Sequence, residues 1–230
     1  MSGYANLTAI LSGNESIGKT WIAMGLAESF SAAGEKVLLV DTDIGFGNLA
    51  ERLKITPDIG LYDALTGNAT LNQAVAFYPE GGFDVIVAGT GVQNIADIPA
   101  SSFLTIKNDL LLLARNYDRV IIDCQTGTGN TPLLFAAASR QALIVVNDNA
   151  PSIRSAYALT AELLNKDICT NIAMTVNLAT SPKDGERVYF TLADAAQKFL
   201  KSVPKWAGAV RKNNFDDILY LAKELTEWTW

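Results

Sequence analysis

The sequence predicts a doubly wound α/β sandwich, that is, a mostly parallel β-sheet with helices on both faces. Short, continuously apolar runs alternate along the chain with longer segments whose apolar residues recur at helical spacing. Continuously apolar strands are typical of parallel strands, which are buried on both faces. Of the 230 residues, 49% are hydrophobic and 18% are charged, and no polar linker divides them. We therefore expect a single domain over residues 1–230.

The individual elements follow in order from the same patterns. A strand is predicted over 7–11, just before Gly13, and a helix over 19–33, where Ile22, Leu26 and Phe30 share one face. Gly34 is placed to end that helix. Further apolar runs predict strands over 37–40, 83–87, 119–123, 143–146 and 172–176. Apolar residues at helical spacing predict the remaining helices over about 104–116, 152–165, 183–201 and 215–228.

The composition excludes several classes of protein. Lys and Arg number 18 and Asp and Glu number 24, so the net charge is −6, and such an acidic chain is a poor general binder of nucleic acid. The absence of histidine excludes Ser-His-Asp hydrolases, Cys-His proteases and His-ligated zinc sites. No apolar run reaches 18 residues, so no transmembrane helix is expected. The first residues lack the pattern of a secretion signal, which favours a cytoplasmic protein.

In a doubly wound sheet, ligands bind beyond the carboxyl ends of the strands. The loops at that edge are therefore expected to share one surface: 12–20, 41–48, 88–94, 123–130 and 147–151. Two kinds of chemical signal fall in these loops, a phosphate-binding motif and a group of carboxylates.

The phosphate-binding motif lies between the first predicted strand and the first predicted helix. Gly13-Asn14-Glu15-Ser16-Ile17-Gly18-Lys19-Thr20 matches the P-loop pattern G-x-x-x-x-G-K-[ST] in full. In that pattern backbone amides surround the phosphates, the lysine reaches the β- and γ-phosphates, and the hydroxyl binds Mg²⁺. An ordinary glycine turn before a helix is the alternative interpretation. We expect a nucleotide, with Mg²⁺, to contact residues 13–20 and the following Trp21.

Three aspartates support this interpretation. Asp123 ends an apolar strand, as a Walker B aspartate does, while Asp41 and Asp43 follow the second strand. Paired carboxylates near a metal bind its waters or orient an attacking water. Capping of a turn after a strand is the alternative role for Asp41 and Asp43. We expect Thr20, Asp41 and Asp123 to surround the metal.

Further segments resemble, in the same order, motifs of the MinD/ParA class of P-loop ATPases. They are Asp41–Asn48, similar to the switch I pattern D-x-D-x-G-x-x-N; Leu61–Gly67, similar to L-x-D-x-L-x-G; Ala88–Gly91; Asp123–Gly127, at switch II; and Asn147–Tyr157. Within that class, the segment from Thr175 through Asn177, with the helix that ends in Phe199 and Leu200, is similar to the FlhG regulators of flagellar number, also called YlxH or FleN. The resemblance covers about residues 7–228.

The resemblance implies an ATP-dependent homodimer in which two subunits sandwich two nucleotides. It assigns Lys19 and Thr20 to phosphate and Mg²⁺, Asp123 to the Walker B position, and Asp43 to orienting the lytic water, so that Asp43 and Lys19 are the expected catalytic residues. Asp41 and Asn48 would belong to switch I, and Asn177 would contact the adenine edge. It also implies a role at a polar structure such as the flagellum, with an FlhF-like GTPase or a flagellar protein as partner.

The departures from the family pattern bear directly on catalysis. The family's phosphate loop reads K-G-G-x-G-K-T, and its first lysine reaches the partner's phosphates, whereas this chain has Asn14-Glu15-Ser16 at those positions. A bridging cation is lost and a carboxylate that repels phosphate is gained. Switch II also differs, with Gln125 and Thr126 in place of the usual small pair. We therefore expect slow hydrolysis at best, and the alternative function is a pseudo-ATPase adaptor that binds protein partners without turnover.

The two ends of the sequence also depart from the resemblance. Many FlhG proteins carry an N-terminal extension that activates FlhF, but only about six residues precede the first predicted strand here.

Near the C-terminus, apolar residues recur at helical spacing: Ile218, Leu219, Leu221, Ala222, Leu225 and Trp228, followed by Trp230. A membrane anchor is one interpretation, but Asp216, Asp217, Glu224 and Glu227 make the segment acidic, which favours a helix docked on the domain or a partner. The stretch 198–212 has five basic residues and no acidic one. We interpret it either as a modest contact patch for a partner or as an ordinary solvated face.

The leading hypothesis from the sequence is an ATP-switched dimer that controls the placement or number of a polar structure, with flagella as the expected target. A nucleotide-locked adaptor is the rival from a different functional class, and a DNA-binding ParA-like ATPase is disfavoured by the acidic composition. We expect a cytoplasmic location, with peripheral attachment to the inner membrane or cell pole as the alternative.

Overall fold

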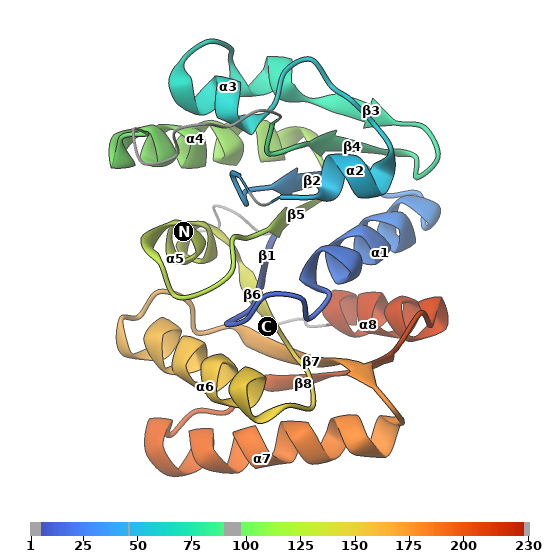
Figure 1. Cartoon of the computed structure of the whole chain (residues 1–230), viewed down its shortest axis with the longest axis vertical. Helices are drawn as coiled ribbons and strands as arrows, with labels where there is room; N and C mark the ends of the chain where they lie inside the picture. Colours follow the sequence, from blue (N-terminus) through green and yellow to red (C-terminus); the bar gives the residue numbers. More distant parts are fainter. Residues whose placement is uncertain (1–5, 46, 90–97, 228–230) are drawn as a thin grey trace.

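One eight-stranded sheet runs through the part of the chain that the structure describes (Figure 1). The computed structural model describes residues 6–45, 47–89 and 98–227. The strands pair in the order β3-β4-β2-β5-β1-β6-β7-β8, and all neighbours except β3 and β4 are parallel. Their bounds are β1 Leu7–Leu11, β2 Val37–Asp41, β3 Ala76–Tyr78, β4 Phe83–Ile86, β5 Arg119–Asp123, β6 Gln141–Val146, β7 Ile172–Ala179 and β8 Lys205–Arg211.

Helices cover both faces of this sheet, so the prediction of a doubly wound α/β domain is confirmed (Figure 1). Helices α1, α2 and α8 pack on one face, and α3 to α7 pack on the other. Their bounds are α1 Lys19–Ala32, α2 Leu49–Leu53, α3 Leu61–Thr66, α4 Ala100–Leu113, α5 Asn130–Ala138, α6 Ala150–Asn165, α7 Pro182–Leu200 and α8 Phe215–Glu227. Short 3₁₀ turns add η1 Leu71–Ala74 and η3 Ala114–Asn116.

The two outer strands, β3 and β8, were not predicted from the sequence. Strand β3 is only three residues long, and its Phe77 is exposed. Strand β8 lies within the basic stretch 198–212, where its buried Ala207 and Val210 are flanked by exposed Lys205 and Arg211. Edge strands of this kind lack the continuous apolar run that marks a central strand. The helices α2, α3 and α5 were likewise not predicted, and α4 begins at Ala100 rather than near residue 104.

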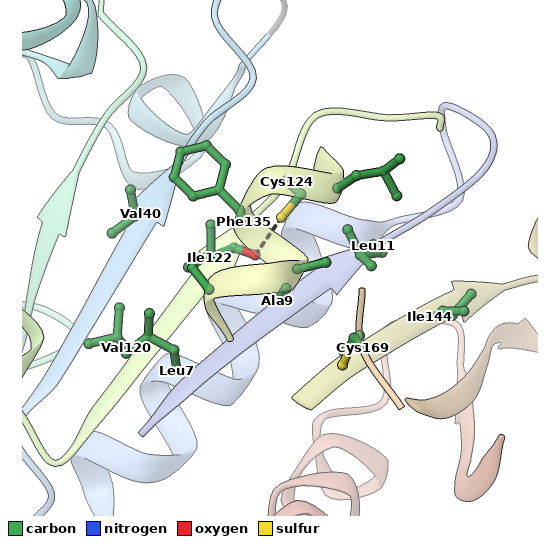
Figure 2. Close-up of a cluster of buried hydrophobic side chains, with 14 of the residues drawn as sticks. Leu7, Ala9, Leu11, Val40, Val120, Ile122, Cys124, Phe135, Ile144 and Cys169 are labelled. Carbon is green, nitrogen blue, oxygen red and sulfur yellow. Dashed lines mark hydrogen bonds between the residues drawn. The ribbon is translucent and has the colours of Figure 1, made fainter. Parts of the chain in front are cut away.

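The core forms two layers, one on each side of the sheet. Along β1, Leu7, Ala9 and Leu11 face the layer under α4 to α7, while Ile10 faces α1. Figure 2 shows Phe135 of α5 packed among residues of β1 and β5, beside the buried thiol of Cys124. Both cysteines are free and lie in this apolar layer. None of the helices in the described ranges is long and apolar enough to cross a bilayer.

The C-terminal helix α8 packs against α1 and β8. Its buried residues are Ile218, Leu221, Ala222 and Leu225. Gly25 of α1 makes the contact close, because a Cβ at that position would lie 2.5 Å from Cδ1 of Ile218. These four residues of the predicted apolar face therefore pack inside the domain, as expected for a docked helix. Trp228 and Trp230 lie outside the described residues.

Replacement of Ile218 by alanine is expected to lower the free energy of unfolding by about 2–4 kcal/mol, because the side chain is fully buried between α8 and α1. The measurement is urea unfolding. The neighbouring Leu219→Ala is the matched control, since Leu219 is 45% exposed, and its effect should stay within about 0.5 kcal/mol. Equal small effects of both variants would mean that α8 is not docked on α1 in solution.

Candidate functional site

A cavity of about 380 Å³ lies at the carboxyl edge of the sheet. Its volume falls within the range of small-ligand sites. The described lining residues come from the loops that follow β1, β2 and β5, three of the five loops predicted to share this surface; loop 147–151 contributes none, and most of loop 88–94 lies outside the described residues. The lining residues are Ser12, Asn14, Glu15, Ser16, Ile17, Gly18, Lys19, Thr20, Asp43, Gly47, Asn48, Arg52, Gln125 and Thr126.

The P-loop leads from β1 directly into α1. Gly18 has φ +83°, a left-handed conformation that favours glycine, and helix α1 begins at the next residue. No described side chain caps this helix end, and its first turn contains no acidic residue. Backbone N–H groups at an uncapped helix N-terminus bind anions well, because they lack intrahelical partners and the helix dipole is positive there.

Asn177 at the end of β7 supports the P-loop from behind. Its Nδ2 donates a hydrogen bond of 2.7 Å to the carbonyl oxygen of Ile17, and a Cβ on Gly18 would clash with the same nitrogen. The side chain is fully buried, and its Oδ1 has no hydrogen-bond partner among the described residues. Gly18 therefore satisfies two requirements, a positive φ and a close approach to Asn177.

Lys19 and Asp123 form a buried ion pair beneath the cavity. Nζ of Lys19 lies 2.6 Å from Oδ1 of Asp123, and the two side chains are 7% and 1% exposed. Burial disfavours the ammonium, but the adjacent Asp123 carboxylate outweighs it and raises the pKa of Lys19. The P-loop lysine is thus held in its charged form by the aspartate that ends β5.

Asp41 lies next to this pair, because β2 and β5 run side by side with Asp41 opposite Asp123. Burial, followed by the charge of Asp123, raises the pKa of Asp41 to about 7. Oδ1 of Asp41 accepts a hydrogen bond of 2.9 Å from the backbone N–H of Asp43. The pKa of Asp43 is also raised, again mainly by burial, although Asp43 is less enclosed than Asp41 and reaches the cavity.

The residues present fit a magnesium ion that is shared with a phosphate. In the described ranges no group of three or more His, Cys, Asp or Glu side chains could hold a metal by itself. Mg²⁺ in nucleotide sites is bound through few protein oxygens, together with substrate phosphates and water. Thr20 lines the cavity, and the carboxyl groups of Asp41 and Asp123 are buried at the ends of β2 and β5; a hydroxyl with nearby carboxylates is the kind of donor set such an ion uses.

Asn14, at the position of the family's first lysine, is held within its own chain. Its Oδ1 accepts a hydrogen bond from Oγ of Ser155 on α6, and Ser12 donates a bond of 3.1 Å to its carbonyl oxygen. Gly13 fits tightly here, because a Cβ would overlap Ser155. The neighbouring Glu15 and Ser16 are exposed at the mouth of the cavity.

Most of the residues predicted for the site line the cavity or lie just beneath it. Gly13, Trp21 and Asn177 do not line it: Gly13 packs against Ser155, Trp21 is half-buried on α1, and Asn177 lies behind the P-loop. The lining residues that received no individual role from the sequence are Ser12, Gly47, Arg52, Gln125 and Thr126, although Gly47, Gln125 and Thr126 lie in the segments that resemble switch I and switch II. Arg52 carries no motif that could reveal it, because only the turn from switch I into α2 brings it to the cavity. Of the segment Ala88–Gly91, which resembles a family motif, Thr90 and Gly91 lie outside the described residues.

Comparison with known proteins agrees with this geometry. The family model described as "AAA domain" matches residues 7–176. The chain belongs to the MinD/ParA family of P-loop ATPases. It is 29% identical over 203 residues to the antiactivator FleN of Pseudomonas aeruginosa, covering 88% of this chain and 72% of FleN. It is 28% identical over 214 residues to the flagellum site-determining protein YlxH of Helicobacter pylori, covering 92% and 71%.

Solved structures agree on the fold. MinD from Pyrococcus horikoshii in complex with Mg-ADP matches with a TM-score of 0.79 at 19% identity, over 97% of this chain and 96% of that chain. MinD from Aquifex aeolicus in its complex with MinC matches with a TM-score of 0.75 at 21% identity, over 98% and 97%. Proteins with this fold thus include one that binds Mg-ADP and one that binds a protein partner.

The raised pKa of Asp41 predicts a pH dependence of stability in the absence of nucleotide and Mg²⁺. Between its ordinary value of 3.8 and about 7 the unfolded chain has lost the proton that the folded chain keeps, so the unfolded state binds fewer protons. The free energy of unfolding should therefore fall as pH rises through this window, and Asp41→Asn should remove that fall.

The measurement is urea unfolding of both proteins from about pH 4 to about pH 8. Asp58→Asn, which removes an exposed carboxyl far from Lys19, serves as the control and should leave the wild-type profile unchanged. A constant difference between wild type and Asp41→Asn across this range would show that Asp41 is already ionised in the folded protein.

Proposed function

We propose that the protein is an ATP- and Mg²⁺-binding switch that dimerises with nucleotide and regulates the placement or number of a polar structure, in the manner of FleN and YlxH. The observation that supports nucleotide binding most directly is the open N-terminus of α1, with Lys19 and Thr20 in its first turn. The likeness to YlxH, a flagellum site-determining protein, supports the flagellar role. The expected partners are a second copy of the chain and a flagellar protein or FlhF-like GTPase.

The residues of the cavity divide the task of holding Mg-ATP. The backbone amides of residues 13–18 would surround the phosphates, and Lys19 would shift from Asp123 toward the β- and γ-phosphate oxygens. Thr20 would hold the metal, and Asp41 and Asp123 would receive its bound waters. When bound, Mg²⁺ neutralises charge on the phosphates. Asp43, at the cavity wall, would orient the attacking water, whereas Asn177 is buried behind the P-loop and supports Ile17 rather than reaching the cavity.

Slow hydrolysis is part of this proposal. Asn14 is uncharged and is engaged by Ser155, so it does not provide the cation that the family places at this position. Glu15 adds a negative charge at the cavity mouth, where it opposes the charge of the phosphates. The second candidate function, an adaptor that binds partners without turnover, is favoured by these same two residues. Under either function, we expect a cytoplasmic protein that attaches peripherally at the membrane or pole, if at all.

Lys19→Ala is expected to abolish binding of Mg-ATP, measured by isothermal titration calorimetry, because it removes the ammonium nearest the P-loop amides. This variant also leaves Asp123 buried without its partner, so Thr20→Ala is the second variant: it keeps the ion pair and should weaken binding only when Mg²⁺ is present. Lys212→Ala, an exposed lysine of the basic stretch, is the control. Equal binding by wild type and Lys19→Ala would refute the assignment of the P-loop.

Asp43→Ala is expected to trap an ATP-bound dimer, because the subunits would close on the nucleotide without the carboxylate that orients water. Size-exclusion chromatography with light scattering, with and without Mg-ATP, measures the mass, and release on denaturation counts the nucleotide. Asp58→Ala is the control. If neither wild type nor Asp43→Ala changes its mass when Mg-ATP is added, the proposed nucleotide-dependent dimerisation is wrong, and the adaptor function is favoured instead.

A further inference from the structure

Arg52 of α2 lines the candidate nucleotide cavity. It lines the cavity together with Asp43, Gly47 and Asn48, which all come from the segment after β2. Arg52 is one of two cations among the lining residues, and the other is Lys19. The family resemblance assigns no role to this position, and no motif in the sequence includes it.

In the described part of the chain, the guanidinium of Arg52 is fixed through Nε, and its two terminal nitrogens form no ion pair. Its Nε donates a hydrogen bond of 2.8 Å to Oδ1 of Asn48, and its backbone N–H donates one of 3.0 Å to the carbonyl oxygen of the same residue. No carboxylate in the described ranges forms an ion pair with Arg52. This differs from Lys19, whose ammonium is engaged by Asp123. A guanidinium fixed at Nε presents its terminal N–H groups in a planar fork that suits phosphate oxygens.

The charges around the cavity create a need for such a group. Glu15 and Asp43 line the wall, while Asp41 and Asp123 lie beneath it, so without Arg52 the described lining would offer only Lys19 against four carboxyl groups. A Mg-ATP complex adds further negative charge. Arg52 is therefore the described residue best placed to offset repulsion at this wall.

The position of Arg52 in the fold indicates which phosphate it meets. The amides of the P-loop and α1 surround the central phosphates of a bound nucleotide. Arg52 lies with Asp43, Gln125 and Thr126 on the side built by the loops after β2 and β5, and no described lining residue comes from the loops after β6 or β7. This is the end of the cavity where Mg²⁺ and the terminal phosphate belong.

We propose that Arg52 binds the terminal phosphate of ATP from within the same chain and so supplies the cationic contact that Asn14 does not make. The proposal rests on the nucleotide-binding function proposed above. Its specific consequence is discrimination between nucleotides: Arg52 stabilises a bound triphosphate and contributes little to a bound diphosphate. It also couples α2, through Asn48, to the presence of the terminal phosphate.

The test compares Arg52→Gln with wild type by calorimetric titration of a non-hydrolysable ATP analogue and of ADP, each with Mg²⁺. The variant should bind the triphosphate about 10- to 100-fold more weakly, as expected for loss of one charge-assisted hydrogen bond. Binding of ADP should change less than about threefold, and Arg52→Lys should recover part of the loss. Lys54→Gln is the matched control, since it removes an exposed positive charge two residues away that does not line the cavity.

The other outcomes overturn the proposal. If Arg52→Gln binds both nucleotides equally more weakly, Arg52 has a general electrostatic or structural role. If both affinities are unchanged, Arg52 does not contact the bound nucleotide. If Lys19→Ala loses binding while Arg52→Gln matches wild type, the proposed function stands and this inference fails. If wild type binds neither nucleotide, the proposed function fails and Arg52 fails with it.

Discussion

The buried ion pair between Lys19 and Asp123 is the interaction on which the arrangement of the site depends. It joins the first turn of α1 to the end of β5 at 2.6 Å, across the strand pairing that sets β1 beside β5. Two charges removed from water are costly unless each satisfies the other. The pair therefore fixes how α1 emerges from the P-loop, and with it the direction of the open N–H groups at Gly18.

Because Lys19 pairs with Asp123, the neighbouring carboxyl groups of Asp41 and Asp43 form no ion pair within the described residues. Asp41 lies opposite Asp123 in the β2–β5 register, and its burial beside that charge favours the protonated form. Binding of a metal would reverse this preference, because a divalent cation stabilises the ionised carboxylates and releases Lys19 toward phosphate. The raised pKa of Asp41 and the Lys19–Asp123 ion pair are thus the two features that bound Mg-ATP would change.

The central part of the fold was predictable because its signals are local. Strands such as 7–11 and 119–123 are continuously apolar, and the P-loop pattern names its residues by spacing alone. The outer strand β8 was not, because only its middle, Ala207 and Val210, is buried. The contacts of the site depend on tertiary structure: Ser155 reaches Asn14 from a helix 141 positions later in the chain, and α2 turns Arg52 toward a loop about 30 residues earlier.

If the protein dimerises as proposed, these tertiary contacts change which groups the partner subunit must provide to the phosphates. In the family pattern that this chain resembles, a lysine of one subunit reaches the phosphates bound by the other. Here Asn14 is turned toward Ser155, and the guanidinium of Arg52 lies in the same chain as the P-loop. A terminal phosphate that contacts Arg52 would act on Asn48 and α2 without any partner. Under the proposed function, the conformational response to ATP would precede dimerisation, and the movement of α2 would distinguish a switch from an adaptor.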